Sequence, residues 1–208
     1  MAVPVVFLGF LGLSFLVLWV ITRFGEPSAD GEFVEIIFSG TCLDESTPPL
    51  LKRAQQVGMD AKMDNGSMRT NLPDIENARS IVPAMLATTG ALLVTADGFE
   101  AGNDAIQDVA INLDKAGMPE TLIKFSAGAR AAIKELDDNM QLQLSIDGQA
   151  LPSVRVANVK EEGVLSLHSG EGKTSIRMQR AADRAIVLAH GPLPCPIQVQ
   201  SVRPIAPQ

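Results

Sequence analysis

An uncharged apolar run opens the chain and predicts a membrane anchor. Residues 2–22 contain no charged side chain, which gives 21 consecutive residues of mostly apolar character. As a helix this run would be about 31 Å long, and the hydrocarbon core of a bilayer is about 30 Å thick. Trp19 lies near its end, where indole rings prefer the membrane interface, and Arg23 closes the run. We therefore predict a transmembrane anchor over residues 1–23 and a linker over residues 24–32.

A cleaved signal peptide is the main alternative to this anchor. Signal peptides combine a basic start, a short apolar core and a small-residue cleavage site. Here the start lacks Lys and Arg, the apolar run is too long, and residues 23–27 contain no cleavage motif. The anchor is favoured, and both interpretations send the rest of the chain to a membrane or across it. Charge counting sets no orientation, because only the α-amino group and Arg23 flank the run.

The pattern after the linker alternates between the periods of strands and helices. Partial alternation of β-branched and aromatic residues indicates strands, Asn-Gly favours a two-residue turn, and proline suits the first turn of a helix. We expect a strand at 33–38, a helix with Pro48 and Pro49 in its first turn, a hairpin at Asn65-Gly66 followed by a strand at 67–72, a helix capped by Asp74 and a strand at 91–95. This βαββαβ order predicts a ferredoxin-like base subdomain over residues 33–98.

The second half of the chain shows a similar alternation of strand and helix patterns. We expect strands at 105–112, 121–125, 142–146, 154–156, 164–167 and 197–202, and helices capped by Ser126 and Thr174. Asp147-Gly148 predicts a hairpin, and Gly191 followed by three prolines ends the last helix. The fold class is therefore α+β: an N-terminal transmembrane helix and two small α+β subdomains, the second over residues 99–208.

Composition narrows the classes of partner. The formal net charge of −7 argues against binding to nucleic acid and against electrostatic docking on an anionic lipid surface. The chain has no tyrosine, and its single tryptophan lies in the predicted anchor, so aromatic platforms for bases or sugars are nearly absent from the rest.

A series of short motifs resembles one family. Ordered along the chain, they are Leu72-Pro73-Asp74, Ala78-Arg79, Thr89-Gly90-Ala91-Leu92-Leu93-Val94, Phe125-Ser126-Ala127-Gly128-Ala129-Arg130, Leu142–Ile146 with Asp147-Gly148-Gln149-Ala150, and Gly191-Pro192-Leu193-Pro194-Cys195-Pro196-Ile197. Together with the preceding apolar run they resemble the first periplasmic domain of the protein translocase subunit SecD, over residues 33–203. The resemblance implies a ferredoxin-like base that carries a head, so the second subdomain is SecD-head-like.

The resemblance also implies a location and a role. It places the chain in the inner membrane as a single-pass protein, with a cytoplasmic N-terminus and a periplasmic domain that contacts a polypeptide or a neighbouring membrane protein. SecD continues into further membrane helices with acidic residues tied to proton-driven movement. No second apolar run of 18 residues follows in this sequence, so we expect no coupling to a proton gradient by this chain alone.

Few side chains stand out as candidates for contacts. Arg177, Arg180 and Arg184 share one face of the last predicted helix, which is either solvated or a contact for an acidic partner. Cys42 and Cys195 would pair in an oxidising compartment, or are two independent buried residues.

Catalytic and metal-binding patterns are absent from the sequence. Gly172-Lys173-Thr174 lacks the earlier glycine of a phosphate-binding loop, so a simple strand-to-helix loop is favoured. His168 and His190 lack ligand spacing to the cysteines, and no Gly-x-Ser-x-Gly element is present. We expect no cofactor, no metal site and no enzyme activity.

These observations favour a non-catalytic accessory or structural subunit of a larger membrane complex. Gly9 and Gly12 give the anchor a small-residue face that admits a neighbouring helix, while exposure of this face to lipid is equally compatible with the sequence. The alternative is a periplasmic polypeptide-binding module that assists protein export, in which an exposed edge strand takes up an extended segment.

Overall fold

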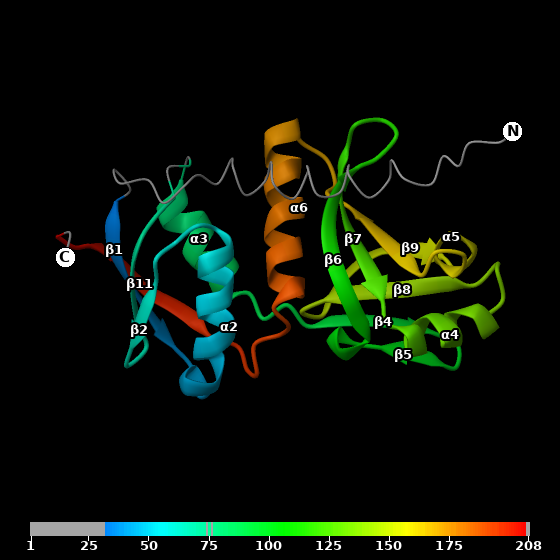
Figure 1. Cartoon of the computed structure of the whole chain (residues 1–208), viewed down its shortest axis with the longest axis horizontal. Coiled ribbons are helices and arrows are strands. Elements are labelled where there is room, and N and C mark those ends of the chain that lie inside the picture. Colours follow the sequence, from blue (N-terminus) through cyan, green and yellow to red (C-terminus); the bar gives the residue numbers. More distant parts are fainter. Residues whose placement is uncertain (1–31, 74, 76, 207–208) are drawn as a thin grey trace, which may run out of the picture.

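The computed structural model describes residues 32–206 apart from residues 74 and 76. The predicted anchor, with Gly9, Gly12, Trp19 and Arg23, lies outside the described residues, as does the predicted helix cap Asp74. Among the described residues, no helix combines the length and the apolar character needed to cross a bilayer. The domain after the linker is α+β with antiparallel sheets, as the sequence pattern predicts (Figure 1).

One four-stranded antiparallel sheet forms the base. Its strands are β1 (Phe33–Ser39), β2 (Lys62–Asp64), β3 (Ser67–Asn71) and β11 (Gln198–Pro204), in the order β11-β1-β3-β2. Helices α2 (Leu43–Gln56) and α3 (Ala78–Ala87) pack on the face of β1 that buries every second residue. The first and third strands are central and the second and fourth lie at the edges, which is the ferredoxin-like arrangement.

The predicted boundary at residue 98 is wrong. Strand β4 (Leu92–Ala96), which we expected to complete the base, instead pairs with β5 (Phe99–Ala101) and β8 (Gln141–Ile146). The fourth base strand is β11, which pairs with β1 from Val34 opposite Pro204 to Ser39 opposite Gln198. The base is therefore discontinuous, and the other subdomain is inserted between α3 and β11.

The inserted head contains two further antiparallel sheets. One has the order β5-β4-β8-β9 and the other β10-β7-β6. The remaining head elements are β6 (Ile106–Leu113), β7 (Pro119–Phe125), β9 (Gln149–Arg155), β10 (Val164–His168), α4 (Ala127–Glu135), α5 (Ala157–Lys160) and a 3-10 turn, η2 (Asn103–Ala105).

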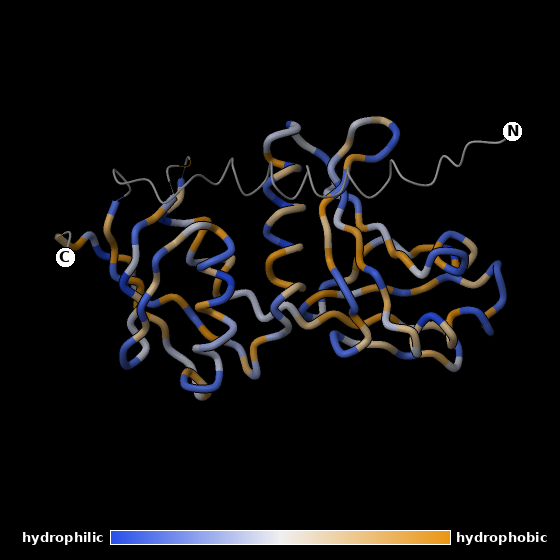
Figure 2. Tube along the Cα trace, viewed as in Figure 1, coloured by the Kyte–Doolittle hydropathy of each residue, from blue (hydrophilic) through white to orange (hydrophobic). Residues whose placement is uncertain are grey.

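Helix α6 (Thr174–Ala189) lies between base and head (Figure 1). Two hydrophobic cores meet at its C-terminal half. Ile186 and Val187 belong to the base core, and Leu188 belongs to the head core. Hydrophobic stretches of the chain occur in both subdomains, and along α6 hydrophobic positions alternate with hydrophilic ones (Figure 2). The helix is thus the structural bridge that couples the two cores.

Helix starts differ from the sequence expectations at two places. Helix α2 begins at Leu43, so Pro48 and Pro49 lie within the helix and not in its first turn. The carbonyls that these prolines leave without helical donors belong to Asp44 and Glu45, which are exposed to solvent. Thr174 is the first residue of α6 and not its cap, and Lys173 at the cap position makes no side-chain bond.

Other local signals are confirmed. Asn65 and Asp147 adopt positive φ angles of 47° and 52°, each followed by a glycine, in the two predicted hairpin turns. The Ser126 hydroxyl accepts a bond from the Ala129 N–H at 3.5 Å and caps α4. Gly191, with φ of 75°, follows the end of α6.

Candidate functional site

A hollow on the head lies between strands β9 and β10. We call it the head groove. It has a volume of about 300 Å³, and the residues that line it come from β9, α5, β10 and α6. They are Leu151, Pro152, Ser153, Val154, Arg155, Asn158, Val159, Val164, Ser166, Leu167, His168 and Arg184. Both strands are edge strands of different sheets, so each presents one side of its backbone without a strand partner.

The backbone register of β10 shows which groups face the groove. The Phe125 N–H donates to the Gly163 carbonyl at 2.9 Å, so this pair, which continues the β7–β10 ladder by one step, is hydrogen-bonded. Hydrogen-bonded and non-hydrogen-bonded pairs alternate along an antiparallel ladder. Val164, Ser166 and His168 therefore direct their N–H and C=O groups away from β7, toward the groove that they line.

Strand β10 is open to pairing, whereas β9 is protected. The register of β9 against β8 shifts between Leu142 and Leu144, which marks a bulge, and Pro152 lies in the bulged stretch. Bulges and prolines are devices that keep an edge strand from adding further strands. The pairing of β10 with β7 is regular over its five residues, and β10 contains neither proline nor glycine. The receptive edge of the groove is β10.

A buried carboxylate holds the outer face of β10 in place. Glu120 on β7 is only 7% exposed and accepts hydrogen bonds from the Ser166 hydroxyl and, at 2.9 Å, from the side-chain amide of Asn112. The Nδ1 atom of His168 lies 3.9 Å from the same carboxylate. This network ties β6, β7 and β10 together and holds the edge strand in place.

Arg184 supplies a cation at the end of the groove. Its Nη1 donates to the carbonyls of Leu167 and His168, both at 3.3 Å. Burial lowers the pKa of Arg184, and the charge of Arg180 lowers it further. Within the described part of the chain the hydrogen bonds of this guanidinium come from Nη1 alone, so Nε and Nη2 can donate to a carbonyl or carboxylate in the groove.

A larger hollow, the base–head cleft, adjoins the head groove. It has a volume of about 670 Å³ and lies between α3, the β8–β9 hairpin and α6. Leu151 and Arg184 line both hollows, so the two hollows lie next to each other. The Asp183 carboxyl in this cleft accepts a bond from Gln179 at 2.7 Å. Burial raises the pKa of Asp183 to about 6, although the bond from Gln179 opposes the rise.

Arg53 fixes the two chain connections that join base and head. It is fully buried on α2, and its guanidinium donates to carbonyls at the end of α3, in the following connection and after α6. The acceptors are Leu86 at 2.9 Å, Thr88 at 2.5 Å, Thr89 at 3.1 Å, Val187 at 3.5 Å and Gly191 at 2.8 Å. Burial lowers the pKa of Arg53 to about 10, and the charge of Asp147 opposes this shift.

The three arginines predicted as a contact face bind within the domain. Arg180 Nη1 donates to the Glu171 carbonyl at 2.8 Å, and Arg177 Nη1 contacts the Met118 sulfur at 3.0 Å. Arg184 is the member of the set that lies in the head groove. Arg180 thus fastens the loop before α6 while it stays exposed, and Arg177 and Arg184 contact the β6–β7 turn and β10. Contact of this face with an acidic partner stays a prediction.

Cys42 and Cys195 form a disulfide bond, with a Cα–Cα distance of 6.1 Å. The bond joins the start of α2 to the segment before β11, across 153 positions of sequence. His190 lies at the end of α6 beside Gln56, and burial together with Arg53 and Lys52 lowers the pKa of this histidine. The described residues include no cluster of three or more metal-ligating side chains.

Comparison with known proteins identifies the fold. No family model and no curated protein sequence matches the chain. A solved structure described as SecDF in a super-membrane-facing form matches 92% of this chain with a TM-score of 0.63 and 14% identity. The domain has a SecD-like fold. The chain spans 34% of that SecDF chain.

A second SecDF structure agrees with this result. It is described as a membrane component that enhances protein export, and it matches 84% of this chain and 99% of its own length, with a TM-score of 0.58 and 15% identity. The inserted head is consistent with the two-part base-and-head organisation that the sequence resemblance implies. At these identities the likeness shows the fold of the SecD-like domain.

The residues that organise this site were not predicted from the sequence. Arg53 lies three positions after Leu50 and therefore on the apolar stripe of α2, where an arginine is unexpected; this was the available signal. The outward edge of β10 left no such signal. Which side of a strand remains unpaired depends on the order of strands in the sheet, and this order involves contacts distant in sequence.

Proposed function

We propose that this chain is a non-catalytic, membrane-anchored accessory component of protein export, whose SecD-like domain holds an extended polypeptide segment along β10. The observation that carries the proposal is the regular, unprotected edge of β10 beside the head groove. An extended segment would add to this edge by backbone hydrogen bonding, which is independent of client sequence.

The chemistry of the groove suits an unfolded client. Leu151, Val154 and Leu167 are among its apolar lining residues, and alternate side chains of an added strand would contact them. Each backbone hydrogen bond contributes only about 0.5–1.5 kcal/mol net, so three outward-facing residues support a weak and reversible contact. Such a contact allows a chain in transit to be released.

The non-catalytic part of the proposal rests on the arrangement of the polar groups. Ser166, Glu120 and His168 lie together, but the Ser166 hydroxyl donates to the carboxylate and not to the histidine. A nucleophilic serine requires a base that accepts its proton, and that base is in turn oriented by a carboxylate. Here the carboxylate holds the serine, which is the geometry of a structural bond.

A stably packed structural subunit is the second candidate. It is favoured by the small-residue face of the predicted anchor at Gly9 and Gly12. In that case the chain would elute from mildly solubilised membranes in one large assembly of fixed stoichiometry. A polypeptide-binding component would instead carry many clients in small amounts, or associate with translocon components.

The binding proposal is tested by two substitutions at one position. In full-length chain reconstituted in nanodiscs, Ser166→Pro removes the outward N–H of β10, whereas Ser166→Ala removes only the hydroxyl bond to Glu120. We expect Ser166→Pro to weaken binding of a reduced, carboxymethylated unfolded protein by about tenfold or more, because about 1.4 kcal/mol corresponds to a factor of ten. Ser166→Ala should bind as the wild type does.

The control for this test is a proline on another edge. Val109→Pro removes an N–H that points away from β7 on the outer side of β6, because Asp114 and Met118 form a hydrogen-bonded pair in that ladder. This variant should retain binding, and circular dichroism checks that each variant folds. Equal binding by Ser166→Pro and wild type would refute the β10 site.

A further inference from the structure

The charges of the head groove differ from those of the chain as a whole. The chain has a formal net charge of −7, yet the ionisable residues that line the groove are basic: Arg155, His168 and Arg184. In the described part of the chain, no Asp or Glu is among the residues that line it. The groove is therefore a basic site in an acidic protein, and this charge bears on which polypeptides it accepts.

Arg184 has no carboxylate within ion-pair distance among the described residues. Its Nη1 donates to the carbonyl oxygens of Leu167 and His168, both at 3.3 Å. Burial lowers the pKa of Arg184, the charge of Arg180 lowers it further, and a carboxylate beside the guanidinium would oppose both effects. A partly buried charge without a counter-ion costs free energy, so a carboxylate supplied by a bound polypeptide would be stabilising.

The unused edge of the Arg184 guanidinium suits a carboxylate. Its Nε and Nη2 atoms lie on one edge of the guanidinium plane, the arrangement that binds both oxygens of a carboxylate at once. The His168 carbonyl that Nη1 contacts faces the groove, and a strand added to β10 would run about 5 Å from it. The side chain of a client residue beside His168 therefore reaches the guanidinium.

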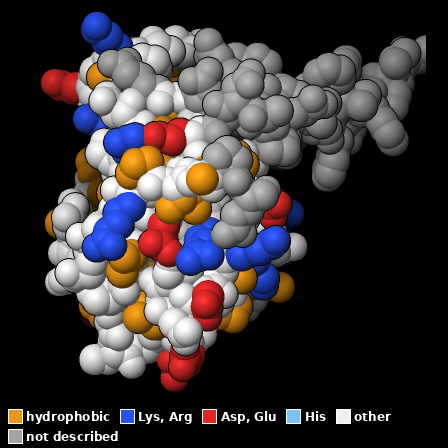
Figure 3. All heavy atoms as spheres, turned by 90° about the vertical axis from the view of Figure 1, so that its left-hand side faces the viewer, with side chains coloured by type: hydrophobic (Ala, Val, Ile, Leu, Met, Phe, Trp, Pro, Cys, Tyr) orange, Lys and Arg blue, Asp and Glu red, His pale blue; other side chains and the backbone are white. Residues whose placement is uncertain are grey.

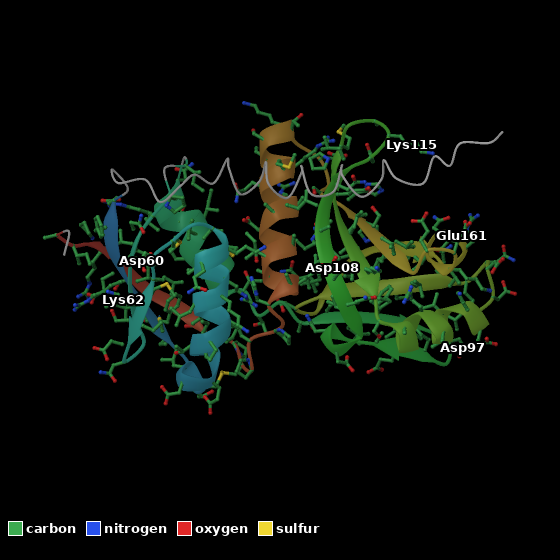
Figure 4. All side chains as sticks on the ribbon, viewed as in Figure 1. Asp60, Lys62, Asp97, Asp108, Lys115 and Glu161 are labelled. Carbon is green, nitrogen blue, oxygen red and sulfur yellow. A yellow bond between two sulfur atoms is a disulfide. The ribbon has the colours of Figure 1, made fainter. Side chains whose placement is uncertain are left out.

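The acids of the head that lie closest in sequence or space are held elsewhere. The Glu120 carboxylate accepts the Ser166 hydroxyl, and Asp183 lines the base–head cleft and not the head groove. Figure 4 shows Asp97 and Glu161 on the side of the head away from α6, the helix that carries Arg184. These carboxylates leave the Arg184 end of the groove to a ligand.

The cations of the base are arranged differently. Figure 3 shows basic and acidic side chains next to one another on the outer end of the base. Arg69 Nε lies 3.3 Å from a Glu35 carboxylate oxygen, and Arg79 pairs with Glu32. Arginines with such partners are already neutralised locally, so they differ from Arg184 in the head groove.

We propose that the head groove selects extended polypeptide segments that place a carboxylate next to Arg184. This inference rests on the proposed function, because it names the class of client that the β10 edge prefers. Backbone bonding to β10 holds any extended segment, and the pair with Arg184 adds a preference among segments. The net charge of −7 alone would favour basic clients, so the local and the global charge predict opposite preferences.

Peptide competition tests the preference. Full-length chain in nanodiscs of uncharged phosphatidylcholine binds a labelled, reduced unfolded protein whose cysteines carry neutral carbamidomethyl groups. The competing peptides are short, acetylated and amidated, alternate valine with threonine, and carry glutamate, glutamine or lysine at both ends, so the direction of the added strand does not matter. A fourth peptide has glutamine ends and a free terminal carboxylate, which distinguishes a chain end from a side chain as the source.

We expect the glutamate peptide to displace the unfolded protein at a concentration about fivefold lower than the glutamine peptide, and the lysine peptide to be the weakest competitor. Stronger displacement by the fourth peptide alone would support a carboxylate at a chain end. Arg184→Gln should remove each preference for a carboxylate. Arg177→Gln is the matched control, because it removes the same charge from α6 outside the groove, and it should keep the preference. Circular dichroism checks that both variants fold.

Equal displacement by the glutamate, glutamine and fourth peptides, or a preference for lysine, would overturn the inference. A carboxylate preference that persists in Arg184→Gln would overturn it as well, as would failure of all four peptides to displace the unfolded protein. In each of these cases the weaker binding expected of Ser166→Pro reports separately on the β10 site. Loss of the charge preference and loss of the proposed function are therefore distinguishable.

Discussion

At the residue scale, ionisable groups are buried at the junction of base and head, and this burial shifts their pKa values. The two Nη atoms of Arg53 donate to carbonyls in two connections, whereas Asp183 faces the base–head cleft with one side-chain partner. A buried carboxyl with a raised pKa prefers to be protonated in the folded state. Asp183 therefore makes stability depend on pH in a direction opposite to that of most carboxylates.

Asp183→Asn should flatten part of this pH dependence. The pKa of Asp183 is raised from 3.8 to about 6, so its favourable contribution is fully present below pH 3.8 and is lost as the pH rises through 6. At pH 7 the variant should be more stable than wild type by up to about 2 kcal/mol, while the two should be alike near pH 3.5. Urea unfolding across this range checks the difference.

The difference in free energy of unfolding between wild type and Asp183→Asn reports on this carboxyl alone, because other titrating groups contribute equally to both proteins. His190, for example, has a lowered pKa, so its contribution is present above pH 6.5 and is lost as the pH falls. A difference that does not change between pH 3.5 and pH 7 would show that the Asp183 carboxyl is not desolvated in the fold.

At the element scale, local signals in the sequence predict most helices and turns, but not which strands pair. Asn65-Gly66, Asp147-Gly148 and the Ser126 cap act over a few residues, and the structure contains each of them. The pairing of β1 with β11 joins residues more than 150 positions apart, and sequence order alone suggested that β4 completes the base. The insertion of the head between α3 and β11 depends on contacts between residues distant in sequence, and no local sequence pattern indicates it.

Arg53→Met should loosen the junction between these elements. It leaves several buried carbonyls without donors, and each unsatisfied group costs about 1–3 kcal/mol, so we expect destabilisation of at least about 3 kcal/mol. The neighbouring exposed Lys52→Met is the matched control and should change stability by less than about 0.5 kcal/mol. Denaturant unfolding measures both, and a cost for Arg53→Met as small as the control would contradict the role assigned to its carbonyl contacts.

At the scale of the whole molecule, three features act together: the discontinuous base, the inserted head and the disulfide. The bond between Cys42 and Cys195 closes a loop that contains the whole head and most of the base. It ties the segment that enters β11, and hence the last strand of the base, to the start of α2. A disulfide of this kind also agrees with the predicted extracytoplasmic location, because such bonds persist in oxidising compartments.

Replacing both Cys42 and Cys195 by serine should lower the free energy of unfolding by about 2–5 kcal/mol, since the cross-link restricts the unfolded chain over a long loop. Reduction of the wild type with dithiothreitol should give a similar loss and leave the double variant unchanged. An unfolding midpoint that does not respond to reduction would contradict a stabilising role for the bond.

The most direct test of the account uses a photo-cross-linking amino acid in native membranes. It is placed at Ser166 on the open edge of β10, and at Val109 on the outer edge of β6 as the control, in C-terminally tagged full-length chain. The account predicts adducts from position 166 to a broad range of exported polypeptides, and few from position 109. A single stoichiometric partner at both positions, or no client adducts at position 166, would contradict the proposed role in export.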